Sequence, residues 1–132
     1  MRRQAVEPDA GSITALVVCL VVVFIACAGL VLDGGRLVGA RSQAASLALG
    51  ASRDGVQAVH RLREGLIVID APAAERRAES YLAVAGAAGS AVATEDSVTV
   101  TVSIVVTPIL LGLFGIGPRT VEVRRTATPV DH

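Results

Sequence analysis

The stretch ITALVVCLVVVFIACAGLVL, residues 13–32, decides how the rest of the chain is arranged. It contains no charged side chain and no Pro, and Thr14 is its only clearly polar residue. A helix of about 20 residues rises about 30 Å, which is the thickness of the hydrocarbon core of a bilayer. Because the stretch is apolar on every side, it has no face suited to water. It predicts a single membrane-spanning helix.

The composition of the whole chain leaves room for one small domain besides this helix. The chain has 132 residues, of which 52% are hydrophobic, with twelve basic and twelve acidic side chains. A balanced charge predicts neither a nucleic acid nor an acidic substrate as a partner. Cys19 and Cys27 both lie in the apolar stretch. Their separation along a helix is too large for a disulfide, so we interpret them as small apolar side chains.

Residues 1–12 form a short polar tail before the span. Arg2 and Arg3 precede the apolar run, as in a signal sequence or a signal anchor. Arg36 and Arg41 flank the other end of the span, so charge alone does not set the topology. The free amine and the shortness of the tail favour a cytoplasmic N-terminus. We therefore predict a single-pass protein of the cell (inner or plasma) membrane whose C-terminal domain is extracytoplasmic.

Three kinds of processing compete in this region. Residues 26–28 (ACA) resemble a signal peptidase site, and residues 24–27 (FIAC) faintly resemble a lipobox. Gly11 and Ser12 stand just before the span, where prepilin-like proteins are cut. The apolar run is longer than a usual signal-peptide core and continues to Leu32. We favour an uncleaved anchor, with trimming at Gly11-Ser12 as the second hypothesis.

Beyond the span, the helical pattern continues through residues 33–65 and predicts a stalk. Asp33 ends the apolar run and Arg36 follows one turn later, so the two can form an ion pair at the membrane edge or contact a partner there. The apolar side of the predicted stalk consists mostly of small residues, which let a neighbouring backbone approach closely. The residues that we expect in such helix packing are Gly35, Ala40, Ala44, Ala48 and Ala51.

Residues 66–132 predict a small domain of one helix on a short antiparallel sheet. An apolar run at 66–69 is a strand or a packed connector, and Asp70 with Pro72 begins a helix. The expected core side of this helix is Ala74, Ala78, Tyr81, Leu82 and Ala85. Apolar residues then alternate with polar ones over 98–104 and 120–124, which predicts two strands. A short strand near 91–94, turning at Glu95-Asp96, adds a hairpin. The predicted fold class is an α+β membrane protein.

The connection between the two alternating segments, residues 107–118 (TPILLGLFGIGP), is unusually apolar. Connections are normally polar and exposed. Either this one folds under the sheet and helps to close a small core, or it is an exposed patch that meets lipid or another subunit. The residues of such a patch are Leu110, Leu111, Leu113, Phe114 and Ile116.

The sequence contains no motif for catalysis, for a metal or for a cofactor. His60 and His132 are the only histidines, and neither stands at metal-ligand spacing from a Cys, His or carboxylate. Phosphate-binding and nucleophile motifs are absent. We therefore expect no enzyme activity, no cofactor, no nucleic acid and no small-molecule substrate.

The order of these features resembles the TadE/TadG-like proteins of Flp (tight-adherence) pilus systems, in the small version common in actinobacteria. The resemblance rests on Gly11-Ser12 before the span, on DGGRL at 33–37 with AR at 40–41 and QAA at 43–45, on Tyr81-Leu82, and on LGLFGI at 111–116. It implies a pseudopilin-like membrane protein of a pilus assembly or secretion apparatus. Such a protein would act by packing against the membrane helices of other subunits.

Two functional hypotheses follow. In the first, the chain is a structural subunit of a pilus or secretion system, and its helix assembles laterally with other membrane proteins of that system. In the second, it is a tethered extracytoplasmic binding or accessory module, such as a sensor or a lipoprotein-like protein. The span is then only an anchor, and the sheet or residues 107–118 bind the partner.

Overall fold

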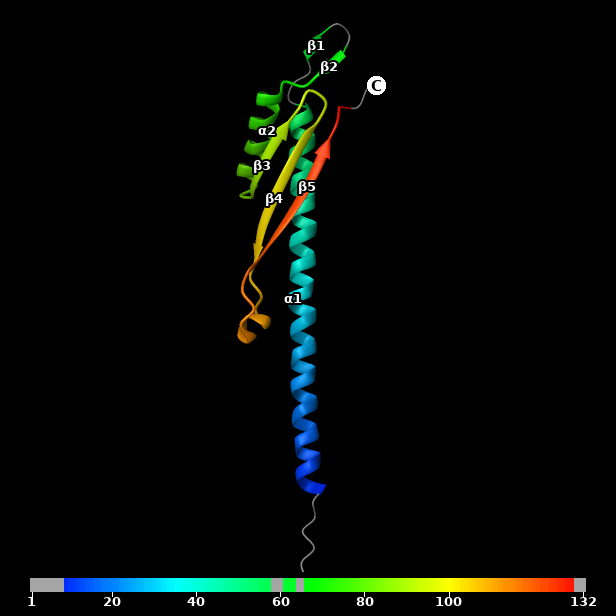
Figure 1. Ribbon diagram of the computed structural model, residues 1–132, viewed down its shortest axis with the longest axis vertical. Helices are drawn as coiled ribbons and strands as arrows, with labels where there is room; N and C mark the ends of the chain where they lie inside the picture. The colour runs from blue at the N-terminus through cyan, green and yellow to red at the C-terminus, as the bar shows by residue number, and fades with distance from the viewer. Residues whose placement is uncertain (1–8, 58–60, 64–65, 130–132) are drawn as a thin grey trace, which may run out of the picture.

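The protein is a long helical rod that carries a small head along one end (Figure 1). The computed structural model describes residues 9–57, 61–63 and 66–129. The elements in chain order are α1 (Asp9–Gln57), β1 (Arg61–Arg63), β2 (Leu66–Val68), α2 (Ala71–Val84), β3 (Ala88–Ala93), β4 (Val98–Val106), the 3-10 helix η1 (Leu111–Phe114) and β5 (Arg119–Ala127).

Span and stalk form one unbroken helix, α1, of 49 residues. The helical pattern predicted through residues 33–65 extends too far, because α1 ends at Gln57 and residues 61–63 form β1. The chain there pairs antiparallel with β2, with Leu62 opposite Ile67. This ladder gives the backbone groups partners that a continued helix would otherwise supply. The tail residues 1–8 and the expected helix stop at Gly65 lie outside the described residues.

The head is built on a three-stranded antiparallel sheet in the order β3-β4-β5. Val98, Val100 and Val102 are fully buried, whereas the residues between them face the other side. The predicted alternation is thereby confirmed, as is the hairpin before it, although β3 begins earlier than expected, at Ala88. Arg125 lies opposite Val100 in an unbroken register, so β5 is a regular edge strand without a bulge.

Both helices lie against the sheet: α1 contacts β4 and β5, and α2 contacts β3 and α1 (Figure 1). Ala74, Ala78 and Leu82 of α2 are buried, as predicted. Tyr81 and Ala85 are exposed, contrary to our expectation. The physical reason is that the buried side of α2 is one narrow stripe with a four-residue repeat. Tyr81 lies at the edge of this stripe, with its hydroxyl beside Gly50 of α1.

The core of the head includes the last third of α1. Ala44, Ala48 and Ala51 are fully buried there, together with the valines of β4. The elements approach closely: a Cβ added to Gly55 would lie 3.1 Å from a methyl carbon of Val98. The head therefore has no core of its own apart from α1, and the upper part of the rod is one wall of the domain.

Candidate functional site

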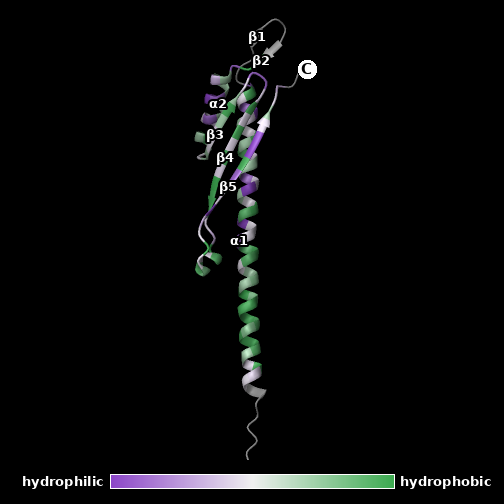
Figure 2. Ribbon diagram, in the orientation of Figure 1, coloured by the Kyte–Doolittle hydropathy of each residue, from purple (hydrophilic) through white to green (hydrophobic). Residues whose placement is uncertain are grey.

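The helix α1 has two segments with different surroundings (Figure 2). Residues 13–32, the bare segment, are exposed on all sides except at Gly29. Residues 40–57, the covered segment, bury one stripe under the head. Among the described residues α1 is the one helix long and apolar enough to cross a membrane. The lower end of the head meets the upper end of the bare segment, and the candidate site lies at this junction (Figure 1).

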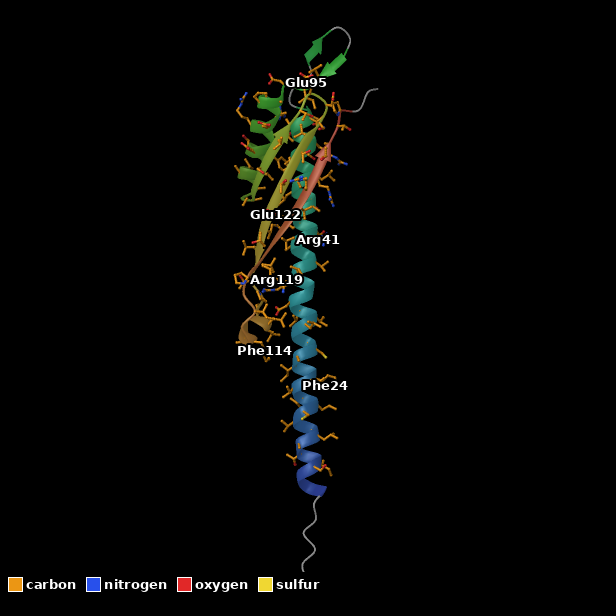
Figure 3. The ribbon with its side chains drawn as sticks, viewed as in Figure 1. Phe24, Arg41, Glu95, Phe114, Arg119 and Glu122 are labelled. Atoms are coloured by element: carbon orange, nitrogen blue, oxygen red, sulfur yellow. The ribbon has the colours of Figure 1, made fainter. Side chains whose placement is uncertain are left out.

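The apolar connection 107–118 forms this lower end of the head. It leaves β4, makes the short helix η1 and returns to β5, and it extends beyond the sheet along α1 (Figures 1 and 3). Gly115 ends η1 with a φ of 85°, a left-handed conformation that favours glycine. The amide of Ile116 donates to the carbonyl of Leu111 over 3.1 Å. The connection is thus a compact hydrogen-bonded turn.

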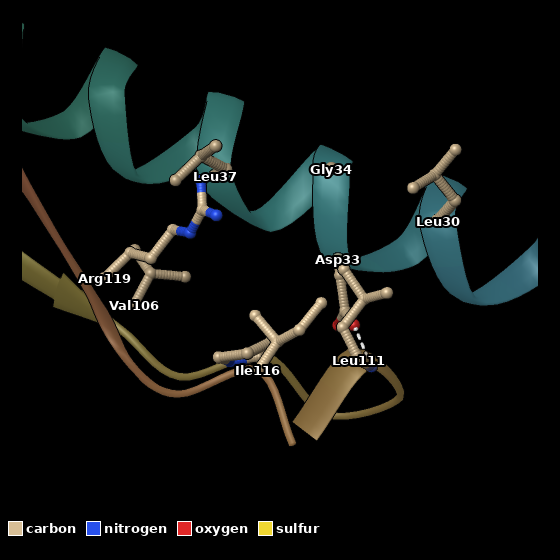
Figure 4. Close-up of a pocket in the computed structure, with 9 residues that line it drawn as sticks. Leu30, Asp33, Gly34, Leu37, Val106, Leu111, Ile116 and Arg119 are labelled. Atoms are coloured by element: carbon tan, nitrogen blue, oxygen red, sulfur yellow. Dashed lines mark hydrogen bonds between the residues drawn. The ribbon is translucent and has the colours of Figure 1, made fainter. Parts of the chain in front are cut away.

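Asp33 of α1 holds this turn by its carboxylate. The backbone amides of Ile109, Leu110 and Leu111 donate to it over 3.0, 3.1 and 2.8 Å. Asp33 is 94% buried, with 6% of its surface exposed, and its carboxylate points from α1 to the start of η1 (Figure 4). A carboxylate that accepts several backbone N–H bonds is a strong, charge-assisted acceptor. The charge at the end of the apolar stretch therefore attaches the connection to α1.

This arrangement differs from the ion pair with Arg36, which was one of the two interpretations of Asp33 from the sequence. Within the described ranges the one ion pair joins Arg77 Nε to Asp54 Oδ2 over 3.2 Å. The amides of Leu111 and then of Ile109 lower the pKa of the Asp33 carboxyl below its ordinary value of 3.8, and burial opposes them. The charge of Arg36 contributes only a smaller lowering of this pKa. The physical reason is that three amide donors at contact distance outweigh one solvated guanidinium.

A cavity of about 260 Å³ separates the connection from α1 (Figure 4). Asp33 and Arg119 are its charged residues, and the Arg119 side chain extends across it toward Leu37 (Figure 4). Below it the two segments touch, since a Cβ added to Gly29 would lie 3.1 Å from the Cβ of Leu110. The other residues that line the cavity are Leu30, Gly34, Val106, Pro108, Leu111 and Ile116.

The connection is not folded under the sheet. No residue of η1 is buried, and the exposed fraction is 80% for Leu113, 74% for Phe114, 58% for Ile109 and 38% for Ile116. Leu110 and Leu111 are half-buried against α1. We call Ile109, Leu113, Phe114 and Ile116 the apolar tip. The sequence analysis did not name Ile109 as a patch residue. The apolar character of the whole connection is the signal that could have identified it.

The small residues that we selected for packing between subunits have different positions. Ala44, Ala48 and Ala51 are in the core of this chain's own head and are closed to another subunit. Ala40 is half-buried, and Gly35 is exposed with open space around it. Small residues on a helix predict that another backbone approaches closely, and for these three alanines that neighbour is the head of the same chain. Gly11 and Ser12 are exposed near the start of α1.

A comparison with protein families matches one part of the chain. Residues 11–58 match the family described as "Putative Flp pilus-assembly TadE/G-like". The matched segment coincides with α1 from Gly11 onward and stops before the sheet and α2. No curated protein and no solved structure matches the chain significantly. The Flp resemblance is therefore supported for the rod, and the head extends beyond the matched segment.

Proposed function

We propose that this chain is a non-catalytic, single-pass membrane subunit of a Flp-type pilus assembly or secretion apparatus. The observation that carries the proposal is that the TadE/G-like match covers residues 11–58, the segment that contains the apolar exposed helix. In such an assembly the chain contributes a membrane helix and an attached head. Its partners are the other membrane proteins of the apparatus.

The proposed layout places residues 1–12 in the cytoplasm, residues 13–32 in the membrane and the head outside. The short tail and its free amine support this orientation, whereas Arg2 and Arg3 on the tail side are balanced by Arg36 and Arg41 on the head side. Residues 33–39 then lie between the membrane and the covered segment, and the connection 107–118 lies beside them through Asp33. The proposed anchor is uncleaved, and trimming at Gly11-Ser12 remains the second hypothesis.

Lateral packing in this proposal uses the side of α1 that the head leaves free. Gly35 and Gly39 are exposed, and a Cβ added to either would meet nothing within 4 Å. At 3.6 residues per turn they lie on the side opposite Ala44 and Ala48. Two glycines four residues apart allow another helix to approach closely. Of the packing residues predicted from the sequence, Gly35 is the one that fits this contact.

The proposal is tested by deleting the gene in its host and restoring it with variants. Pili on the cell surface are counted by electron microscopy, and partners are captured by a photo-cross-linker at the exposed Ser42. Wild type and the control Gly35→Ala/Gly39→Ala, which keeps both residues small, should restore pili and capture pilus-assembly proteins. The double variant Gly35→Leu/Gly39→Leu should restore fewer pili and capture less.

Two outcomes would contradict the proposal. Normal pili after deletion of the gene would show that the chain is not a required subunit of the pilus apparatus. Full function after residues 13–32 are exchanged for an unrelated apolar span, together with full function of the glycine variant, would favour a tethered binding module. The span would then be an anchor with no packing role.

A further inference from the structure

We propose that the apolar tip is a second membrane-contacting element, which inserts into the lipid leaflet on the head's side of the bilayer. The tip is Ile109, Leu113, Phe114 and Ile116, held on the connection 107–118. This inference rests on the proposed membrane span of residues 13–32. It adds that the head is seated on the lipid and is not lifted above it on a stalk.

The contact between Leu110 and Gly29 sets the depth of the tip. Gly29 stands three residues before Leu32, and each residue of a helix rises 1.5 Å. If the bare segment fills the hydrocarbon core, Gly29 lies about 4–5 Å inside the core boundary. Leu110 lies against it. Figure 3 shows Phe114 at the part of the connection farthest from the sheet, at a height between Arg119 and Phe24.

The exposure of the tip is suited to lipid and costly in water. Leu113 and Phe114 expose 80% and 74% of their surfaces, and neither contributes to the core of the head. Contiguous exposed apolar side chains mark contacts with a membrane or with another protein. Here they continue the exposed apolar surface of the bare segment at the same height (Figure 2). The same lipid that covers the bare segment therefore reaches the tip.

The attachment of the tip to α1 makes insertion a fixed property of the fold. The Asp33 carboxylate accepts the three amides that begin the turn, and Gly115 closes it. Backbone N–H groups near hydrocarbon must have partners within the protein, and this carboxylate supplies three of them. The tip thus keeps its height relative to the anchor.

The charges around the connection fit a headgroup layer. The tip itself carries no charge, whereas Arg119 begins β5 immediately above it. Arg36 and Arg41 stand on α1 at and above the height of the cavity (Figure 3 labels Arg41 and Arg119). A headgroup region extends about 5–8 Å beyond the hydrocarbon core, and arginines placed there contact lipid phosphates. Anionic lipid complements this side of the junction.

The test uses the full chain in vesicles of phosphatidylcholine and phosphatidylglycerol. In a Cys19→Ala/Cys27→Ala background, an environment-sensitive dye is placed on single cysteines at Leu113, at Val31 of the bare segment and at Val92 on the sheet. These side chains are all well exposed, at 80%, 74% and 62%. Doxyl-labelled lipids then quench any dye that lies in the acyl region, and a Phe114→Cys variant repeats the measurement at a second tip position.

The tip is supported if the dyes at Leu113 and Phe114 are quenched about as strongly as the dye at Val31, while the dye at Val92 is quenched little. It is overturned if the tip dyes behave like Val92 while Val31 is quenched, and the span then stands without it. Absence of quenching at Val31 would instead show that residues 13–32 do not span the membrane, and it would contradict the proposed membrane subunit as well. Disulfide-linked dimers through Leu113→Cys, without lipid quenching, would assign the tip to a second copy and overturn the lipid contact.

Discussion

The bare and covered segments of α1 belong to one continuous helix but are built for different surroundings. Residues 13–32 carry large aliphatic side chains on every side and stay exposed, whereas residues 40–57 carry alanine and glycine toward the head and polar residues away from it. Figure 2 shows this change along the rod. The first pattern needs a solvent that is apolar in all directions, and the second needs one close neighbour.

This difference teaches how to interpret small residues on a membrane-proximal helix. The alanine stripe indicated a close contact, and the structure supplies it from the same chain, since Ala48 lies in the core that β4 and α2 complete. Surface for other subunits must then be sought on the opposite side. The predictions below test the two segments in pairs, from the largest expected effect to the smallest.

The largest effect is expected for a charge in the bare segment. Val22→Arg should make membrane partition less favourable by about 2.5–3.5 kcal/mol, the value for Arg at the centre of a span. Ser46→Arg, at an exposed site beside the head, should change it by less than about 0.5 kcal/mol. A translation-arrest measurement of the force that draws the nascent helix into the membrane checks both. Equal forces for the two variants would contradict the distinction between the segments.

A smaller effect is expected from enlarging an alanine. Ala48→Leu forces extra volume into a fully packed core and should destabilise the head by about 1–3 kcal/mol. Ala28→Leu, in the exposed bare segment, should leave the stability of the head unchanged. Thermal unfolding in detergent, followed by circular dichroism, checks the pair. If Ala48→Leu unfolds like the wild type, the alanine stripe does not pack against the head as described.

A local effect is expected at the joint between the segments. Asp33→Asn removes the charge that accepts the amides of Ile109, Leu110 and Leu111, so hydrogen exchange at these amides should become faster. Asp54→Asn is the matched control, because its partner Arg77 is on the surface and such pairs contribute little. Amide exchange by NMR in micelles measures both. Unchanged exchange in Asp33→Asn would show that the carboxylate does not hold the turn.

The smallest effect is a pH dependence of the same joint. The pKa of Asp33 is lowered in the folded state, so its contribution to stability is fully present above 3.8 and is lost as the pH falls through the folded value, below 3.8. The NMR signals of the three amides should therefore stay constant through neutral and mildly acidic pH and move only below 3.8. Signals that move at higher pH, or that move equally in Asp33→Asn, would contradict this.

Local patterns in the sequence predicted the elements of the fold. The apolar run gave the long helix, the two-residue alternation gave β4 and β5, and Asp70-Ala-Pro gave the start of α2. These features depend on neighbours within a few residues, where period and turn chemistry are direct evidence. The end of α1 was missed because the pairing of residues 61–63 with 66–68 is short and leaves no strong signal in the sequence.

The junction could be predicted only in part. The apolar connection was identified from composition, but the role of Asp33 was not, because 76 residues separate it from Ile109. A helical pattern suggests a partner three or four residues away, and for this carboxylate that partner was Arg36. The structure instead brings it amides from the far end of the chain. Contacts of this kind depend on topology, which local residue patterns do not contain.

The central claim is that one helix passes from lipid into the head of its own chain. Spin labels placed one at a time along α1 in lipid vesicles test it, by the access of oxygen and of a water-soluble nickel chelate to each label. We predict oxygen access at all of Leu20, Val21, Val22 and Val23. We predict nickel access at Ser42, Ser46 and Arg53, and less of it at Ala45 and Leu47, which the head partly covers. Nickel access around the whole circumference at residues 20–23 would contradict the account.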